Sequence, residues 1–451
     1  MRKKNKKIFL KMYKNSDILS FANLSKDFND IHFDNEFTYR SVYGKKIVHG
    51  ILILLDTLEK LNSDKILFKV KNINCKFLAP IFVGEKIFFL KNFQKNRVSI
   101  KIFKENNQVC QYIIFFFSEK KINILNLKKK KLINFKKNIF KKNKYKKIRK
   151  IFGVNLIKTL INISYLSGSI IPGNKSILLN IEINLINKDD NKKENNKKII
   201  SFNFDKRFRL YQVILKNNFK IISIKHPEFP KQHEIKNLRK KISYKALIHK
   251  FKKKKCLIIG GTRGLGELFT KILYIVNARC VCTFYKSKKQ LIILKKDFNL
   301  KKINFIKHDI TKKFFLNESF DYIFYFATPK IESNKKKFNQ DLYKKYKLYY
   351  NDLFFKLFKF YHNRNKNLKI FFPSTNFLNY KKSSYKEYCL AKKNTEKKVL
   401  YERKFNKVNN IFFSRLESLN TDQNLSLFGF QDTKDLKNKS VKIANLILNN
   451  I

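Results

Sequence analysis

The clearest change of hydrophobic pattern lies between residues 254 and 285. A short apolar run at 256–259 leads into a glycine-rich turn, and apolar residues at helical spacing follow from 265 to about 275. A second apolar run, RCVCTFY, ends the pattern. Short apolar runs bounded by turn residues are typical of buried strands, and the 3.6-residue period between them is typical of a helix. The pattern predicts a strand, a helix and a second strand, as in parallel α/β sheets.

Residues 150–235 show longer apolar runs around a single helix. The stretch LIKTLINISYL has apolar residues at helical spacing, and PGNKSILLNIEINLI and FRLYQVILKNNFKIISIKHPEFP predict a long strand and a hairpin. Polar low-complexity sequence at 187–199 predicts a surface loop. We therefore divide the chain into a first domain, a second domain, a basic linker and a third domain, at 10–130, 150–235, 236–253 and 254–451.

The composition is that of a globular protein with reduced cysteines. Of 451 residues, 43% are hydrophobic, which is enough to build the cores of two or three domains. The 6 cysteines show no CxxC pair and no metal-ligand spacing, so we expect buried thiols in the cytoplasm, without disulfides or zinc. Apolar runs such as YIIFFF are far shorter than the roughly 18 residues of a membrane span. We therefore expect no membrane span.

The net charge of +68 would ordinarily suggest a protein that binds nucleic acid or a membrane surface. Lys, Asn, Ile, Phe and Tyr dominate the whole chain, however, as AT-rich codons would produce whatever the function. The lysines form no single stripe interleaved with stacking aromatics. We therefore interpret the charge as a solvated lysine surface and expect no nucleic-acid site. A basic nucleic-acid-binding protein that carries relic enzyme motifs is kept as an alternative.

Four of the 11 glycines lie within seven positions, at Gly260, Gly261, Gly264 and Gly266. Glycine lets the backbone turn sharply or approach another group closely. Between a strand and a helix, such a turn lets a pyrophosphate sit at the helix N-terminus, near Leu265, where free N–H groups and the helix dipole favour anions. The turn therefore predicts a dinucleotide site.

Basic residues around this turn favour NADPH over NADH. Arg263 lies in the turn, and Lys286 follows the second strand, where an NAD enzyme usually offers an acid to the ribose hydroxyls. Positive charge there suits a 2′-phosphate, so NADPH is the expected cofactor. Two later strand ends add to the site, since Asp309 is placed to meet the adenine ring and Ala327 to lie beside the cofactor.

A tyrosine and a lysine four residues apart carry the predicted chemistry. Tyr388 and Lys392 share one face of a helix. An adjacent ammonium stabilises a phenolate, so the tyrosine can deliver a proton to a carbonyl while the lysine also holds the ribose. A hydroxyl must polarise the same carbonyl, and either Ser374 or Thr375 could supply it. The pair alone would be uninformative in a chain with 21 Tyr, but it gains weight after the glycine turn.

From residue 254 to about 425, these features resemble the short-chain dehydrogenase/reductase family. The resemblance implies a Rossmann-type doubly wound parallel sheet, with Tyr388 and Lys392 as the family's catalytic pair. Asn351 in LYYNDLFF resembles the helix asparagine that completes the family's proton relay. One departure is FATP, which replaces the usual Asn-Ala-Gly after the fourth strand.

Near the N-terminus, Asp27 and His32 lie five residues apart, and an apolar helix opens at His49 and Gly50. The stretch FANLSKDFNDIHF resembles the GDxNPxH motif of the MaoC-like hydratases, which have the hotdog fold. Lysine and aspartate replace the motif's glycine and proline. The resemblance implies that Asp27 and His32 form a catalytic dyad, and that the Gly50 N–H stabilises an enolate oxygen.

Residues 150–235 are then interpreted as a second, degenerate hotdog, because no histidine lies between His49 and His226 and no second dyad is present. The expected fold class is an α+β double hotdog domain followed by an α/β Rossmann-type doubly wound parallel sheet domain. No metal is expected.

The two halves together predict a bifunctional enzyme of acyl-thioester metabolism. An NADPH-dependent 3-ketoacyl reductase and a 3-hydroxyacyl dehydratase perform consecutive steps of fatty-acid or polyketide-like synthesis. The expected substrates are thioesters of acyl carrier protein or CoA, both of them anionic carriers. The alternative is that one half alone is active and the other is a scaffold. The oligomeric state, including a homo-oligomer, stays open.

Overall fold

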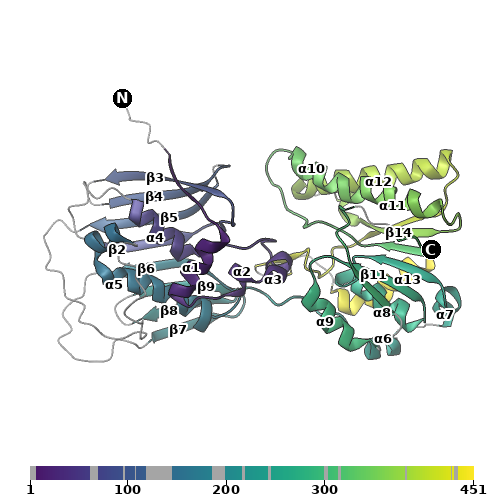
Figure 1. The fold of residues 1–451 in the computed structure, drawn as a ribbon, viewed down its shortest axis with the longest axis horizontal. Coiled ribbons are helices and arrows are strands. Elements are labelled where there is room, and N and C mark those ends of the chain that lie inside the picture. Colours follow the sequence, from purple (N-terminus) through teal and green to yellow (C-terminus); the bar gives the residue numbers. More distant parts are fainter. Residues whose placement is uncertain are drawn as a thin grey trace. The chain divides into compact units, whose positions relative to one another are not determined.

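The computed structural model contains two compact units, Met1–Pro227 and Glu228–Ile451, which we describe separately (Figure 1). None of the helices that the structure describes combines the length and the apolar character that a membrane crossing requires. The described residues are 7–60, 70–94, 97–106, 108–117, 145–184, 199–215, 219–241, 245–298, 303–312, 316–380, 383–427, 429–430 and 435–451.

The first unit is built on one nine-stranded antiparallel sheet, in the order β1-β3-β4-β5-β2-β6-β9-β8-β7 (Figure 1). Strand β4 shows why its residues form such a sheet, since Val98, Ile100 and Ile102 alternate with less buried side chains and turn one apolar face to the core. The strands are β1 (Ile8–Met12), β2 (Val70–Phe77), β3 (Lys86–Gln94), β4 (Arg97–Lys104), β5 (Val109–Phe117), β6 (Ser176–Asn184), β7 (Ile199–Asp205), β8 (Leu210–Leu215) and β9 (Phe219–Lys225).

Two helices pack against this sheet and share one core. Helix α4 (Gly50–Lys60) is buried on almost every side, because GILILL is apolar around the whole helix and such a helix is stable only inside a core. Helix α5 (Lys146–Tyr165) adds Leu156 and Leu160 to the same core. Three further helices precede α4 within the described residues, namely α1 (Asn15–Ser25), α2 (Asp30–Phe33) and α3 (Asn35–Arg40).

The two predicted hotdog halves join where β2 pairs with β6, with Cys75 opposite Ile181. The first half contributes β1 to β5 and α4, and the second contributes α5 and β6 to β9. The predicted long strand is β6, and the predicted hairpin is the antiparallel pair β8 and β9. The double-hotdog expectation is therefore confirmed. Most of the predicted loop at 187–199 lies outside the described residues, and its last residue begins β7.

The second unit contains a six-stranded parallel sheet in the order β12-β11-β10-β13-β14-β15. Numbered along the chain, this order is 3-2-1-4-5-6, which is the order of a Rossmann-type sheet. The predicted α/β class is therefore confirmed. The strands are β10 (Lys255–Ile259), β11 (Arg279–Phe284), β12 (Ile303–Lys307), β13 (Tyr322–Tyr325), β14 (Lys369–Thr375) and β15 (Ile411–Leu416).

Successive residues of β10 point to opposite faces of this sheet, and helices cover both faces. Cys256 and Ile258 pack in the core formed by α8 (Gly264–Ile275), α9 (Lys288–Asp297) and α13 (Leu436–Asn449). Leu257 and Ile259 pack in the core formed by α11 (Leu353–His362) and α12 (Lys386–Phe405). A strand that is buried on both faces must be apolar throughout, which explains why CLII carries no alternation.

The basic stretch 236–253 differs from the linker that its sequence predicted. It holds most of α6 (Ile235–Lys241) and all of α7 (Lys245–Phe251). Leu238, Leu247 and Phe251 from these helices are buried in the core of the second unit. The apolar residues are few and widely spaced among lysines, so the composition concealed two short helices that belong to this unit.

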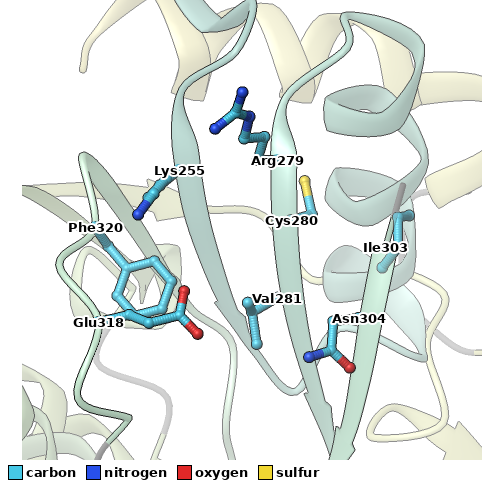
Figure 2. Close-up of a pocket in the computed structure, with 8 residues that line it drawn as sticks. All are labelled: Lys255, Arg279, Cys280, Val281, Ile303, Asn304, Glu318 and Phe320. Atoms are coloured by element: carbon cyan, nitrogen blue, oxygen red, sulfur yellow. The ribbon is translucent and has the colours of Figure 1, made fainter. Parts of the chain in front are cut away.

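The connection from β12 to β13 differs from the usual connection between parallel strands. Within its described parts, 308–312 and 316–321, no helix forms, although parallel strands are usually joined through a helix. A cleft of about 410 Å³ lies beside it, at the amino ends of β10 to β12 (Figure 2). Ligands of open α/β sheets bind at the carboxyl ends, so we do not place the active site here. The cleft is lined by Lys255, Arg279, Cys280, Val281, Ile303, Asn304, Glu318 and Phe320.

Candidate active sites

In the first unit, a short loop between α1 and α2 carries Asp27. Helix α1 ends where Lys26 adopts a left-handed conformation with φ of 62°. Asn29 then caps α2, because its side-chain oxygen accepts a hydrogen bond from the Ile31 N–H at 3.3 Å. His32 follows within α2. The left-handed turn and the cap together fix the segment that brings Asp27 and His32 close in space.

A third side chain, His49, joins this pair. The rings of His32 and His49 stack with their centroids 3.6 Å apart and 26° between their planes. His49 Nε2 lies 3.0 Å from the backbone carbonyl oxygen of Asp27 and 4.0 Å from its Oδ2. All three side chains are buried. The structure thus brings the predicted dyad together and adds His49, which the sequence had placed only at a helix start.

Hydrogen bonds fix the proton positions on both imidazoles. A carbonyl can only accept, so His32 Nδ1–H donates to the Ile47 carbonyl at 2.7 Å and His49 Nε2–H donates to that of Asp27. Burial lowers the pKa of His32 to about 4, although its bond to Ile47 opposes the change. Burial, together with the neighbouring His32, also lowers the pKa of His49 well below its usual value. Both rings are therefore neutral at pH 7, and His32 Nε2 is left as a base.

Asp27 is poised between its two protonation states. Burial raises its pKa to about 6, while hydrogen bonds from Ser164 and from the Asn29 N–H oppose part of that rise. The Ser164 hydroxyl donates to Asp27 Oδ2 at 2.7 Å, and the Asn29 N–H donates to Oδ1 at 3.4 Å. A carboxyl group with a pKa near neutrality can give or take a proton during a reaction.

The second hotdog half builds part of this site. Ser164 lies on α5, and a Cβ atom at Gly168, one turn later, would lie 2.0 Å from Asp27 Oδ1. Asn29 is held in the same way, since its side chain accepts from the Lys175 N–H at 2.8 Å and donates to the Ser176 carbonyl at 3.0 Å. These residues were not predicted from the sequence. A serine and a glycine four apart share a helix face, but that spacing does not identify a partner 137 residues away.

Gly50 opens α4, where the first N–H groups of the helix have no acceptor within the helix itself. A Cβ atom at Gly50 would lie 2.5 Å from Cε1 of Phe77, so only glycine fits beneath this ring. N–H groups at a helix start, reinforced by the helix dipole, can stabilise a developing oxygen anion. The role of Gly50 as an oxyanion donor stays a prediction.

Asp27, His32 and His49 each place one ligand atom within 4.8 Å of the others, as three metal ligands would. Metal–nitrogen bonds of about 2.1 Å diverge from the ion. Two ligating rings are therefore held farther apart than the 3.6 Å that separates the centroids of His32 and His49. The stacked arrangement suits proton transfer better than metal binding.

In the second unit, the glycine turn has the geometry that a dinucleotide requires. Gly260 and Gly264 have φ of 81° and 55°, which few other residues adopt readily. A Cβ atom at Gly266 would lie 2.1 Å from the Gly260 carbonyl oxygen, so only glycine lets α8 approach β10. Ala327 lies beside the turn, since its nitrogen would be 3.3 Å from a Cβ at Gly260. The turn leads into α8, and Leu265 is in its first turn.

The other predicted cofactor residues follow the carboxyl ends of neighbouring strands. Lys286 lies just beyond β11, with its ammonium 5.0 Å from the centroid of the Tyr285 ring. Asp309 lies just beyond β12 and accepts hydrogen bonds from the N–H and hydroxyl of Thr311 at 3.0 and 2.8 Å. Because β10 to β13 are parallel, their carboxyl ends meet at one edge, where such sheets bind ligands.

Arg263 makes an ion pair that the sequence did not predict. Its Nη1 lies 3.0 Å from Oδ2 of Asp422, which follows β15. Lys330 donates to the Asp422 carbonyl at 2.8 Å, and a Cβ atom at Gly264 would touch Thr421 at 3.4 Å. The segment after β15 therefore lies across the glycine turn and holds Arg263 there.

The structure separates the two candidate hydroxyls beside Tyr388. Thr375 lies close to the Tyr388 hydroxyl and opposes the rise in pKa that burial imposes on the tyrosine. Ser374 instead donates to Glu396, which also receives Arg415 Nη2–H at 2.6 Å. Thr375 is therefore the hydroxyl that lies next to the phenol, and Ser374 belongs to a neighbouring ion-pair network.

Lys392 is buried next to Tyr388. Its Nζ donates to the Pro373 carbonyl at 2.6 Å and lies 5.9 Å from the centroid of the Tyr388 ring. Burial lowers the pKa of Lys392 to about 7, and the charge of Glu396 opposes this. Asn351 is half-buried in a π-helical turn, Leu348–Asp352, that joins α10 (Gln340–Lys347) to α11. Such turns are frequent at functional sites.

Comparisons with known proteins bear on both units. Residues 3–110 match the family model described as MaoC like domain. The mitochondrial 3-hydroxyacyl-[acyl-carrier-protein] dehydratase of Arabidopsis thaliana is 24% identical over 110 residues, which are 22% of this chain and 65% of the relative. The chain thus spans less than two thirds of that relative's length.

Similar solved structures come from two groups. The (R)-hydratase from A. caviae involved in PHA biosynthesis is 22% identical with a TM-score of 0.23, and the match covers 25% of this chain and 94% of that one. The 3-oxoacyl (acyl-carrier-protein) reductase from Agrobacterium tumefaciens C58, with NADP bound, is 12% identical with a TM-score of 0.33. That match covers 39% of this chain and 73% of the reductase.

Proposed function

We propose that this chain, which carries a MaoC-like domain in its first unit and a Rossmann-type sheet in its second, reduces 3-ketoacyl thioesters and dehydrates the 3-hydroxyacyl products. The observation that carries the proposal is the presence of two buried acid–base groups, one in each unit. Asp27 and His32 suit the dehydration, and Tyr388 and Lys392 suit the reduction. The names of the Arabidopsis dehydratase and the Agrobacterium reductase support the same pair of reactions.

For dehydration, the proposed roles follow from the protonation states. Neutral His32 takes the proton from C2 of the 3-hydroxyacyl thioester through Nε2, and protonated Asp27 gives its proton to the leaving 3-hydroxyl group. The C3–O bond breaks, the C2–C3 double bond forms, and water leaves. The Gly50 N–H stabilises the enolate oxygen that develops on the thioester. His49 stacks on His32 and holds the base in place.

For reduction, Tyr388 delivers its hydroxyl proton to the ketone oxygen, which Thr375 polarises through a hydrogen bond. Lys392 stabilises the resulting phenolate. NADPH, when bound, would supply the hydride. The glycine turn and the first turn of α8 would hold its pyrophosphate, and the close approach of Gly266 to Gly260 fits that purpose.

The test is incubation of the whole protein with NADPH and a 3-ketoacyl thioester, on acyl carrier protein and on CoA in parallel. Mass spectrometry would follow the ketoacyl, hydroxyacyl and enoyl species over time. We expect all three to appear in that order. Accumulation of hydroxyacyl product without enoyl product would show that the first unit is a scaffold. A steep, salt-dependent affinity for nucleic acid without NADPH binding would favour the nucleic-acid alternative.

Ser164→Ala is expected to extend dehydration to higher pH. The Ser164 hydrogen bond stabilises the ionised carboxylate, so its loss raises the pKa of Asp27 above its present value of about 6. The protonated form, which gives the proton to the leaving group, then persists to higher pH. We expect the alkaline limb of the pH–rate profile to move to higher pH by about one unit. The matched control is Ser167→Ala, because Ser167 lies close by and bonds Ser223 at 2.8 Å instead. An equal shift in both variants would contradict this role.

We also propose that NADPH binds more tightly than NADH, and that Arg263 contributes to the difference. Arg263→Ala is expected to lower the ratio of the NADH dissociation constant to the NADPH dissociation constant by roughly tenfold, because a charge-assisted bond to the 2′-phosphate is lost. Asp422→Asn is the control, since it removes the ion pair and leaves the guanidinium available to phosphate. Fluorescence titration of the unmutated protein and both variants with NADPH and with NADH would measure all six affinities. Equal affinities in the unmutated protein would refute the preference.

A further inference from the structure

The residue before Asn351 is a buried tyrosine that contacts both members of the proposed catalytic pair. Tyr350 is 3% exposed. The Lys392 ammonium lies over its ring, 3.8 Å from the centroid. The Tyr388 ring meets it edge-on, with centroids 5.6 Å apart and 76° between the planes. Tyr350 thus contacts the two side chains whose relative position decides the proton transfer.

Tyr350 is held at both of its ends. Its hydroxyl is hydrogen-bonded to Thr328, directly after Ala327 at the end of β13. Its backbone carbonyl accepts a hydrogen bond from the Thr395 hydroxyl on α12 at 3.1 Å. Thr328 belongs to FATP, the segment where this chain departs from the pattern of the family that it resembles. The departure therefore has a structural use, since it anchors the tyrosine ring.

The positive charge of buried Lys392 requires neighbouring groups that stabilise it. Lys392 is 4% exposed, and burial of an ammonium is costly unless other groups stabilise it. The titratable groups next to it are Tyr388 and Glu396, both on α12, and Tyr350, which lies before α11. Glu396 is already ion-paired with Arg415 at 2.6 Å. The face of an aromatic ring attracts a cation most strongly where water is excluded, and the face of Tyr350 is the nearest one.

We propose that Tyr350 is a positioning residue of the reductase site, whose ring face holds Lys392 as an ammonium ion beside Tyr388. The inference rests on the proposed reductase function. It predicts that the protonation of Lys392 depends on the electron density of the aromatic ring at position 350 and not on the volume of that ring.

The test replaces Tyr350 in the full-length protein with phenylalanine and with its mono-, di- and trifluorinated analogues. Fluorine withdraws electron density from the ring face and hardly alters its size. Competitive acetylation with acetic anhydride, followed by mass spectrometry of the peptide, gives the titration midpoint of Lys392, because only the neutral amine reacts. Exposed Lys393, in the same peptide, is the internal reference.

We expect Tyr350→Phe to keep the midpoint within a few tenths of a pH unit and each added fluorine to lower it, by about one pH unit over the series. The alkaline limb of ketone reduction should move to lower pH in parallel, since the ammonium form is lost earlier. A midpoint that stays constant along the series would overturn the inference, even where reduction is unchanged. Absence of reduction in the unmutated protein would instead overturn the proposed function, and the labelling series would still decide whether the ring holds Lys392.

Discussion

Tyr388→Phe is expected to lower the rate of 3-ketoacyl reduction by roughly 10²- to 10⁴-fold, the usual contribution of a positioned proton donor. The substitution removes the hydroxyl that Thr375 contacts and keeps the ring, which packs against Tyr346, Tyr350 and Phe377. Folding and NADPH binding should therefore persist. The measurement is the rate of NADPH oxidation at saturating substrate, together with the dissociation constant of NADPH.

The matched control for this variant is Tyr385→Phe. Tyr385 lies three residues earlier, just before α12, is half-buried and packs against Phe377, with ring centroids 5.2 Å apart. It has no part in the proposed proton transfer, so its loss of a hydroxyl should leave reduction within a few-fold of the original rate. If Tyr388→Phe also retained reduction near that rate, Tyr388 would not be the proton donor.

His32→Ala should stop dehydration while ketone reduction continues, so that the 3-hydroxyacyl thioester accumulates. Loss of the base is expected to slow dehydration by roughly 10²- to 10⁴-fold. His32 Nε2 is the base that the hydrogen bond from Nδ1 to Ile47 leaves available. His49 also has an unprotonated nitrogen, Nδ1, but burial lowers the pKa of its ring well below the usual value, so His49 is a weak substitute for the base. Mass spectrometry of the ketoacyl, hydroxyacyl and enoyl species over time measures both reactions at once.

A buried histidine outside the dyad, His226, provides the control for His32. His226 donates through Nδ1 to the Pro227 carbonyl at 2.6 Å and accepts from the Val42 N–H at 3.3 Å. His226→Ala therefore reports what the loss of a buried ring costs away from the dyad. Equal slowing in both variants would mean that His32 has a structural role. A mixture of His32→Ala and Tyr388→Phe proteins should restore enoyl formation, because each supplies the step that the other lacks.

Local sequence patterns were enough to predict most of the fold. The run CLIIGGTRGLG predicted β10, the turn and the start of α8, because a buried strand and a glycine turn impose constraints within a few neighbouring residues. The same holds for GILILL and α4. The stretch 236–253 failed for the opposite reason. Its helices are stabilised by the burial of Leu238, Leu247 and Phe251 against distant parts of the second unit, and propensity alone cannot show such contacts.

Sequence distance also separates the site residues that could be predicted from those that could not. Asp27 and His32, or Tyr388 and Lys392, are close in sequence, so a motif could identify them. Ser164 reaches Asp27 across 137 residues, and Asp422 reaches Arg263 across 159. Such contacts depend on how whole elements pack, and a serine or an aspartate has no local pattern that indicates them. Which of Ser374 and Thr375 lies nearer to Tyr388 could not be read from the sequence either, because adjacent strand residues point in opposite directions.

The pairing of β2 with β6 joins the two halves that build the candidate dehydratase site within one chain. If the two hotdog halves were separate subunits, dilution would part Ser164 from Asp27, and the site would form only above a certain protein concentration. One continuous chain replaces that association with an intramolecular contact, for which effective concentrations are typically on the order of millimolar. The contact between Ser164 and Asp27 therefore needs no association of two chains. The second half supplies the serine, the glycine and the sheet edge that the first half uses, and this role requires no dyad in the second half.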